Sequence, residues 1–225
     1  NSDGAFREWL NDDFKDNYSH RHLSHLYPLF PGNEITEESD KRLFSAIVTA
    51  AKKRFEIGLT EQTGWSYAHM ANVAARLKDG EAALKRLEYV ARFCTGKNLL
   101  TYHNDWRNCG VTLDFSVARH APFQIDAIMG FTSAVYECLL YSGGEFCEIF
   151  PAKPAAWNKG EVVGIRGKDG FSFDFLWNES DCKVVVCSEF GGNLHLKING
   201  YDFNRSLDFS KGERKSFSVG RRLKI

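Results

Sequence analysis

The chain has 225 residues, of which 43% are hydrophobic and 14% aromatic, enough apolar material for one or two domains with a substantial core. Its 29 basic and 29 acidic residues cancel, so the composition argues against nucleic acid or an anionic membrane surface as a partner and favours a neutral one. No apolar run approaches the roughly 20 residues that span a bilayer, which argues against a membrane protein.

The beginning of the sequence and its cysteines add two further constraints. The chain opens at Asn1 rather than Met, so we expect it to be processed or cut from a longer polypeptide. Its first residues lack the regions of a signal peptide, and localisation cannot be read because any such signal would lie upstream. None of the six cysteines is spaced as C-x-x-C, which favours reduced thiols in an ordinary core over a zinc site.

The first distinctive stretch is HRHLSHL, which places His20, His22 and His25 within six residues. Three explanations are open. Neutral imidazoles can ligate a metal, although this interval offers no cysteine or acidic partner and Arg21 adds a positive charge. The histidines can instead be loop residues bonded to the backbone, or they can form a polar cradle for a neutral, hydroxyl-rich ligand.

Helical periodicity follows from Thr36 to Gly58, with Thr36 as the expected cap and Gly58 as the expected end. Further helices are predicted over 65–77 and 81–93, joined at the Asp79-Gly80 turn as a helical hairpin. After an irregular stretch that is rich in polar and aromatic residues, a fourth helix is expected from near Phe123 towards residue 143. The first 143 residues therefore predict a helical domain.

Beyond Gly144 the pattern changes to short strands separated by turns: EFCEIF, EVVGIRG, FSFDFLW, KVVVC, LHLKI and KSFSV. In FSFDFLW, large aromatic residues alternate with Ser172 and Asp174, which predicts a strand with one buried face. The preceding Asp169-Gly170 pair predicts a hairpin turn. We therefore expect a fold that is mainly α followed by β, with a helical domain over 1–143 and a β-domain over 144–225.

Two helix beginnings carry candidate functional groups. Gln124 and Asp126 lie where the fourth helix starts, and free N–H groups at a helix start accommodate a carboxylate, although Asp126 can also be a plain helix-start residue. Trp65 begins the second helix, where a tryptophan is more often part of a core than a platform for sugar.

Four blocks in this order resemble glycoside hydrolase family 95, which contains α-L-fucosidases and α-L-galactosidases. They are FREWLNDDFKDNYSHRHLSHLYPLFPGNEIT, TGWSYAHMANVAARLKDG, APFQIDAIMGFTSAVYECLL and GGEFCEIFPAKPAAWNKGEVVGIRGKDGFSFDF. The resemblance covers nearly the whole chain and weakens over the last ~35 residues. It implies the C-terminal part of an (α/α)6 barrel, a partial toroid of helical hairpins, followed by an antiparallel β-sandwich.

The resemblance also assigns roles. An inverting, exo-acting hydrolase of α-L-fucosyl or α-L-galactosyl linkages is implied, in which Asp126 is the carboxylate that activates water. His20, His22, His25, Trp65, His120 and Gln124 become candidates for substrate binding, and no metal or other cofactor is required. The general acid belongs to family segments upstream of Asn1, and neither Glu8 nor Glu61 stands at its position, so we expect the isolated chain to be inactive.

One departure from the family matters. After Asp126 the family usually continues with Gly-Asn-Phe-Gly, whereas this chain has Ala127-Ile128-Met129-Gly130, which leaves the choice between fucose and L-galactose open. The alternative hypothesis is a non-catalytic carbohydrate-binding or structural remnant. A helical domain without its neighbours would expose apolar faces, so the expected partners are an oligosaccharide, the missing N-terminal part, or a second copy of the chain.

Overall fold

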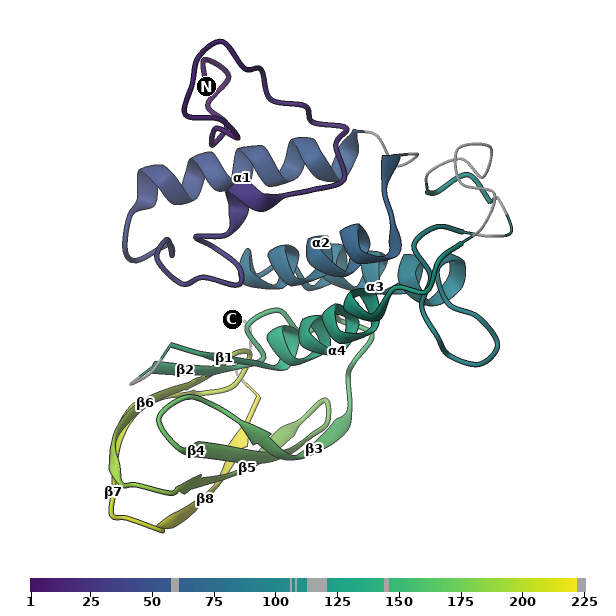
Figure 1. Ribbon diagram of the computed structural model, residues 1–225. Coiled ribbons are helices and arrows are strands. Elements are labelled where there is room, and N and C mark those ends of the chain that lie inside the picture. The colour runs from purple at the N-terminus through teal and green to yellow at the C-terminus, as the bar shows by residue number, and fades with distance from the viewer. Residues whose placement is uncertain (58–60, 106, 108, 113–120, 144–145, 222–225) are drawn as a thin grey trace. The chain divides into compact units, whose positions relative to one another are not determined.

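A computed structural model describes residues 1–225 apart from 58–60, 106, 108, 113–120, 144–145 and 222–225. The chain divides into two compact units, Asn1–Val135 and Tyr136–Ile225, with the division inside the fourth helix. Figure 1 shows helices along the first part of the chain and strands along the last part, as the sequence predicts. No helix among the described residues is both long and apolar enough to cross a membrane.

Among the described residues, one short 3-10 helix and the α-helices α1 to α4 precede the strands. Their bounds are η1 Ser24–Leu26, α1 Lys41–Glu56, α2 Gly64–Arg76, α3 Gly80–Phe93 and α4 Ile125–Leu139. α2 and α3 pack along each other as the predicted hairpin. The turn between them places Lys78 in the left-handed region, and the Asp79 side chain caps α3 by accepting the N–H of Ala82 at 2.9 Å.

The prediction of Thr36 as the cap of α1 is wrong by four residues. Thr36 and Ser39 bond each other's backbone N–H groups through their hydroxyls, which closes a separate turn before the helix. Asp40 then caps α1 by accepting the N–H of Leu43 at 2.9 Å. At the other end α1 stops at Glu56, and Gly58, the predicted terminator, lies outside the described residues.

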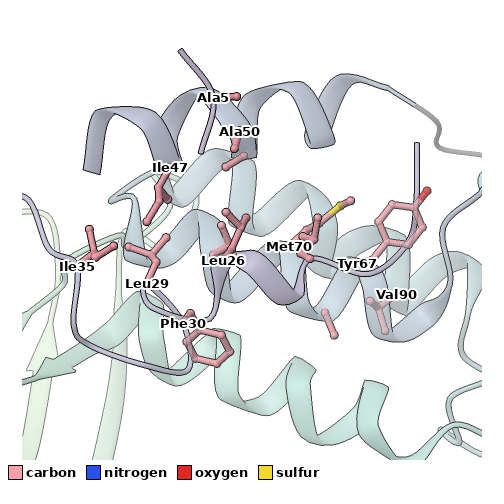
Figure 2. Packing of buried hydrophobic residues seen from close by; sticks show 14 of the residues in the cluster. Ala5, Leu26, Leu29, Phe30, Ile35, Ile47, Ala50, Tyr67, Met70 and Val90 are labelled. Atoms are coloured by element: carbon pink, nitrogen blue, oxygen red, sulfur yellow. The ribbon is translucent and has the colours of Figure 1, made fainter. Parts of the chain in front are cut away.

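The core of the first unit is built around the loop that precedes α1. Figure 2 shows Leu26 and Leu29 of this loop pointing between α1, which contributes Ile47, and α2, which contributes Met70. Burying large apolar side chains in this way stabilises the fold by roughly 1.5–3 kcal/mol each. The loop that carries the histidines is therefore anchored to the helices by its own apolar residues.

The second unit is a β-sandwich of two four-stranded sheets. Their strand orders are β1-β2-β6-β7 and β3-β4-β5-β8. The bounds are β1 Leu140–Ser142, β2 Phe146–Ile149, β3 Gly160–Arg166, β4 Phe171–Trp177, β5 Asp181–Ser188, β6 Gly192–Ile198, β7 Phe203–Phe209 and β8 Arg214–Gly220. Pairing is antiparallel except between β2 and β6, which are parallel.

Aromatic contacts join the two sheets. Phe171 of β4 meets Phe209 of β7 edge-on, with ring centroids 5.5 Å apart, and Phe203 of β7 lies 5.0 Å from Phe217 of β8. The predicted turn is confirmed, since Asp169 and Gly170 both have positive φ between the antiparallel strands β3 and β4. Two strands, β1 and β7, were not predicted from the sequence.

Candidate active site

The loop that carries His20, His22 and His25 is held in place by a buried arginine. Arg54 of α1 has no exposed side-chain surface and donates to the carbonyl oxygens of His20 at 3.2 Å and His22 at 3.4 Å. Its other terminal nitrogen lies 2.7 Å from a carboxylate oxygen of Glu8. Because a buried charge is stable only when it is paired and hydrogen-bonded, these partners hold the backbone of the loop in place.

The three histidines of the loop do not share one environment. The rings of His20 and His22 lie 5.1 Å apart near the surface, whereas His25 turns inward and buries both ring nitrogens. Burial, followed by the nearby charge of Arg54, lowers the pKa of His25 to about 4. Burial and then the charge of Arg21 also lower the pKa of His22, so both imidazoles are neutral at pH 7.

The start of α2 positions an aromatic wall. Thr63 and Ser66 form a reciprocal capping box, and Trp65 lies between them on the first turn of the helix. The Trp65 ring stacks on His69 with centroids 5.3 Å apart and an interplanar angle of 18°. Gly64 is required here because a Cβ at this position would lie 2.5 Å from the carbonyl oxygen of Tyr102.

A short extended segment sets the start of α4. The backbone of Tyr102 pairs with Phe123, and His103 donates its N–H to the carbonyl of Pro122 at 2.8 Å. The side-chain oxygen of Gln124 accepts the backbone N–H of Trp65 at 2.8 Å, which ties the beginnings of α2 and α4 together. Asp126 follows on the first turn of α4, exposed, with one oxygen accepting the N–H of Ala127 at 2.9 Å.

These elements surround a cavity of about 480 Å³ within the first unit. Trp65 and His69 of α2 and Asp126 of α4 are in its wall. The other described residues that line it are Ser24, Tyr27, Phe30, Pro31, Asn72, Met129, Gly130 and Ser133. The cavity is of the size of small-molecule sites and combines apolar walls with a few polar groups.

Comparison with known families gives the cavity a context. Residues 1–139 match the catalytic domain of glycosyl hydrolase family 95, and residues 142–221 match the C-terminal domain of the same family. The chain belongs to glycoside hydrolase family 95. The resemblance of the four sequence blocks is thereby confirmed.

Among family 95 relatives, alpha-L-fucosidase 2 of Arabidopsis thaliana is 36% identical over 180 residues, which are 80% of this chain and 20% of that protein. Probable alpha-fucosidase A of Aspergillus oryzae is 30% identical over 213 residues, 87% of this chain and 28% of that protein. The chain thus spans between a fifth and just over a quarter of the length of these relatives.

The structure brings together some of the predicted site residues of this family 95 chain. Trp65 and Asp126 line the same cavity, and Gln124 lies between their elements. The loop contributes Ser24 and Tyr27 to the described cavity wall. His20, His22 and His25 are not among the described residues that line it. His120 lies outside the described residues.

Two further histidines that interact with predicted site residues were missed. His69 is four residues after Trp65, so the helical spacing places both on one face, and this signal was available in the sequence. His103 carries opposing electrostatic influences, since burial and Arg21 lower its pKa while Asp126 raises it. The charges of Arg21 and Asp126 thus both influence His103, although the three residues are far apart in the sequence.

The part of the chain that the structure describes contains no cluster of side chains that would form a metal site. No three His, Cys, Asp or Glu side chains are grouped closely enough there to hold an ion. His69 lines the cavity as a neutral ring, because burial lowers its pKa. The described wall of the cavity thus combines one carboxylate, that of Asp126, with apolar and uncharged side chains.

Proposed function

We propose that this chain forms one part of the active site of an inverting, exo-acting glycoside hydrolase that removes α-L-fucosyl or α-L-galactosyl residues from oligosaccharides. The observation that carries the proposal is the exposed carboxylate of Asp126 on the wall of a cavity that also contains the stacked rings of Trp65 and His69. Membership of family 95 and the two fucosidase relatives support the class of reaction.

In this proposal Asp126 is the general base. Its carboxylate accepts a proton from a water molecule as that water attacks the anomeric carbon from the face opposite the leaving oxygen. The bond between the anomeric carbon and the leaving oxygen breaks, and a carboxylic acid on the other side protonates that oxygen. Attack from the opposite face inverts the anomeric configuration.

In this proposal the acid comes from a part of the protein outside these 225 residues. Among the described residues that line the cavity, Asp126 is the one that carries a carboxylate. Inverting enzymes need the second carboxyl group about 6.5–9.5 Å away to leave room for the water. Glu8 is a poor candidate for this second group, because its carboxylate is paired with the buried guanidinium of Arg54 at 2.7 Å. We therefore propose that the isolated chain is inactive.

Substrate binding divides between an apolar wall and polar groups. The ring of Trp65 offers apolar surface for the C–H face and the methyl group of a 6-deoxy sugar, which favours fucose. His20, His22, His120 and Gln124 stay predicted hydroxyl-binding residues. For His25 a substrate contact requires the loop to open, because both of its ring nitrogens are buried.

The test is release of free sugar from p-nitrophenyl α-L-fucoside, α-L-galactoside and fucosyl-α-1,2-galactosides. The 225-residue chain is compared with the longest product of the reading frame that contains it. We expect turnover by the longer product alone, and a fall of ~10²–10⁴-fold in kcat for Asp126→Asn. Unchanged turnover in that variant would remove the role of Asp126, and turnover by the 225-residue chain would show that it contains its own acid.

A second candidate function is a non-catalytic carbohydrate-binding remnant. It is favoured by the single carboxylate among the described cavity residues and by the apolar run Ala127 to Met129 that follows Asp126. Binding of fucose by the longest product, without hydrolysis of any of the glycosides, would select it.

A further inference from the structure

A buried asparagine links α2 to α4 close to the cavity. Asn72 has no exposed surface, and its side-chain nitrogen donates to the carbonyl oxygens of Ala68 at 2.8 Å and Gly130 at 2.9 Å. Its side-chain oxygen accepts from the hydroxyl of Ser133 at 2.8 Å. The bond to Ala68 lies within α2, whereas the bonds to Gly130 and Ser133 reach across to α4.

A buried asparagine inside a helix lowers the stability of the fold unless its amide group is hydrogen-bonded. Asparagine is a weak helix former, and burying an amide without partners costs free energy. Here both amide hydrogens and the oxygen are bonded, so the cost is offset by contacts between the helices. Although Asn72 borders the cavity, its two donors are already used, which leaves no N–H group for a ligand.

The Asn72 link reaches α4 about one turn after Asp126. Gln124, two residues before Asp126, is tied to α2 through the N–H of Trp65 at 2.8 Å. Gly130, four residues after Asp126, is tied to α2 through Asn72. The turn of α4 between these positions is thus attached to α2 at both ends.

α2 and α4 also approach each other closely at Gly130. A Cβ at Gly130 would lie 2.9 Å from the Trp65 ring and 3.0 Å from the Cβ of Ala68. α2 and α4 therefore touch here with no space to spare, and the position of Trp65 is set by the same contact.

We propose that Asn72 is a positioning residue for Asp126, an inference that rests on the proposed function of this site. Its cross-helix hydrogen bonds to Gly130 and Ser133 hold α4 against α2 just beyond the first turn, so that the Asp126 carboxylate stays where it can accept the proton of the attacking water. A misplacement of about 1 Å is enough to cost roughly 100-fold in rate.

The test uses the longest product of the reading frame and the best substrate of the sugar-release panel. Asn72→Ala, Asp126→Asn and the double variant are compared with the wild type for kcat and KM. Asp79→Ala is the control, because it removes the cap of α3 without touching the cavity. Ser133→Ala is a milder variant that removes a single bond of the link, for use where Asn72→Ala does not fold.

We expect Asn72→Ala to lower kcat about 10- to 100-fold with KM changed by less than about threefold, and Ser133→Ala to lower kcat less. We expect no further loss when Asn72→Ala is added to Asp126→Asn, because a residue that acts through Asp126 has nothing left to position. The control should retain its kcat.

Two results would overturn the inference alone: an active wild type in which both link variants keep their kcat, or an Asn72→Ala loss of equal size with and without Asp126. A wild type without turnover, or an Asp126→Asn variant with full turnover, would overturn the proposed function and the inference with it.

Discussion

The imidazole of His25 shows how a single side chain responds to its position in the core. Its two ring nitrogens are buried without hydrogen-bond partners among the described residues, and the buried guanidinium of Arg54 lies nearby. A proton on this ring would place a second positive charge in a region that water does not reach. As the pH is lowered, the folded chain therefore keeps His25 neutral down to its pKa of about 4.

We predict that acid destabilises the helical unit through this residue. The folded pKa of about 4 lies below the unfolded value of about 6.5, so the unfolded chain binds more protons between them and stability falls as the pH is lowered through this range. After allowance for partial solvent screening, the expected loss from pH 7 to pH 5 is on the order of 1 kcal/mol. The measurement is the urea midpoint at both pH values.

His25→Gln should flatten that pH dependence, because a glutamine does not titrate. The flattening is partial, since burial also lowers the pKa of His22, His69 and His103. His195→Gln, in the β-sandwich, controls for the loss of an imidazole elsewhere. A His25→Gln variant with the full pH dependence of the wild type would contradict the prediction.

At the scale of single residues, the sequence could indicate only some of the site. Asp126 and Trp65 each stand at a predicted helix start, and the spacing of His69 from Trp65 was readable as one helix face. The bond from Trp65 to Gln124 joins residues 59 positions apart and depends on how two helices approach, which periodicity does not encode. The inward turn of His25 likewise follows from tertiary packing.

At the scale of elements, the strength of the periodic pattern determined what could be predicted. β4 was evident because Phe171, Phe173, Phe175 and Trp177 alternate with smaller or polar residues, and all four are buried. β7 was missed because three consecutive residues of this edge strand are exposed, so no alternation is visible. β1 was missed because Leu140 and Tyr141 continue the apolar pattern of α4.

The alternation in β4 leads to a prediction on stability. Phe173→Ala should destabilise the β-sandwich by ~3–5 kcal/mol, because its fully buried ring leaves a cavity that the sheets can close only in part. Leu176→Ala, in the same strand but 47% exposed, should change stability by less than about 0.5 kcal/mol. Amide hydrogen exchange in β4 and β5 reports both effects locally. Equal protection in the two variants would contradict the buried-face assignment.

For the whole molecule, the sequence predicted the succession of helices and strands, and the structure confirms it. The boundary that we placed after residue 143 stays a prediction beside the compact units Asn1–Val135 and Tyr136–Ile225. The sequence could not tell what covers the helical unit, because the chain spans 20% to 28% of the length of its fucosidase relatives. The exposed surface of α4 indicates where such a cover would bind.

α4 exposes apolar side chains on successive turns. Ile125 is 59% exposed and Met129 65% exposed, and their spacing of four residues places them side by side on the helix. Contiguous apolar surface of this kind marks an interaction site, since water contact with it is unfavourable. We therefore predict that the 225-residue chain associates with itself in solution.

Sedimentation equilibrium at about 10 µM should give a mass above that of the monomer, and the double variant Ile125→Glu, Met129→Glu should shift it towards the monomer because charges oppose burial of the face. Leu176→Glu, an equally apolar exposed position on β4, is the matched control and should leave the mass unchanged. In the longest product of the reading frame, where we expect other helices to cover this face, the same double variant should lower stability instead. A wild-type chain that is monomeric at this concentration would show that the apolar face of α4 is stable in water. It would contradict the prediction that further helices bury this face.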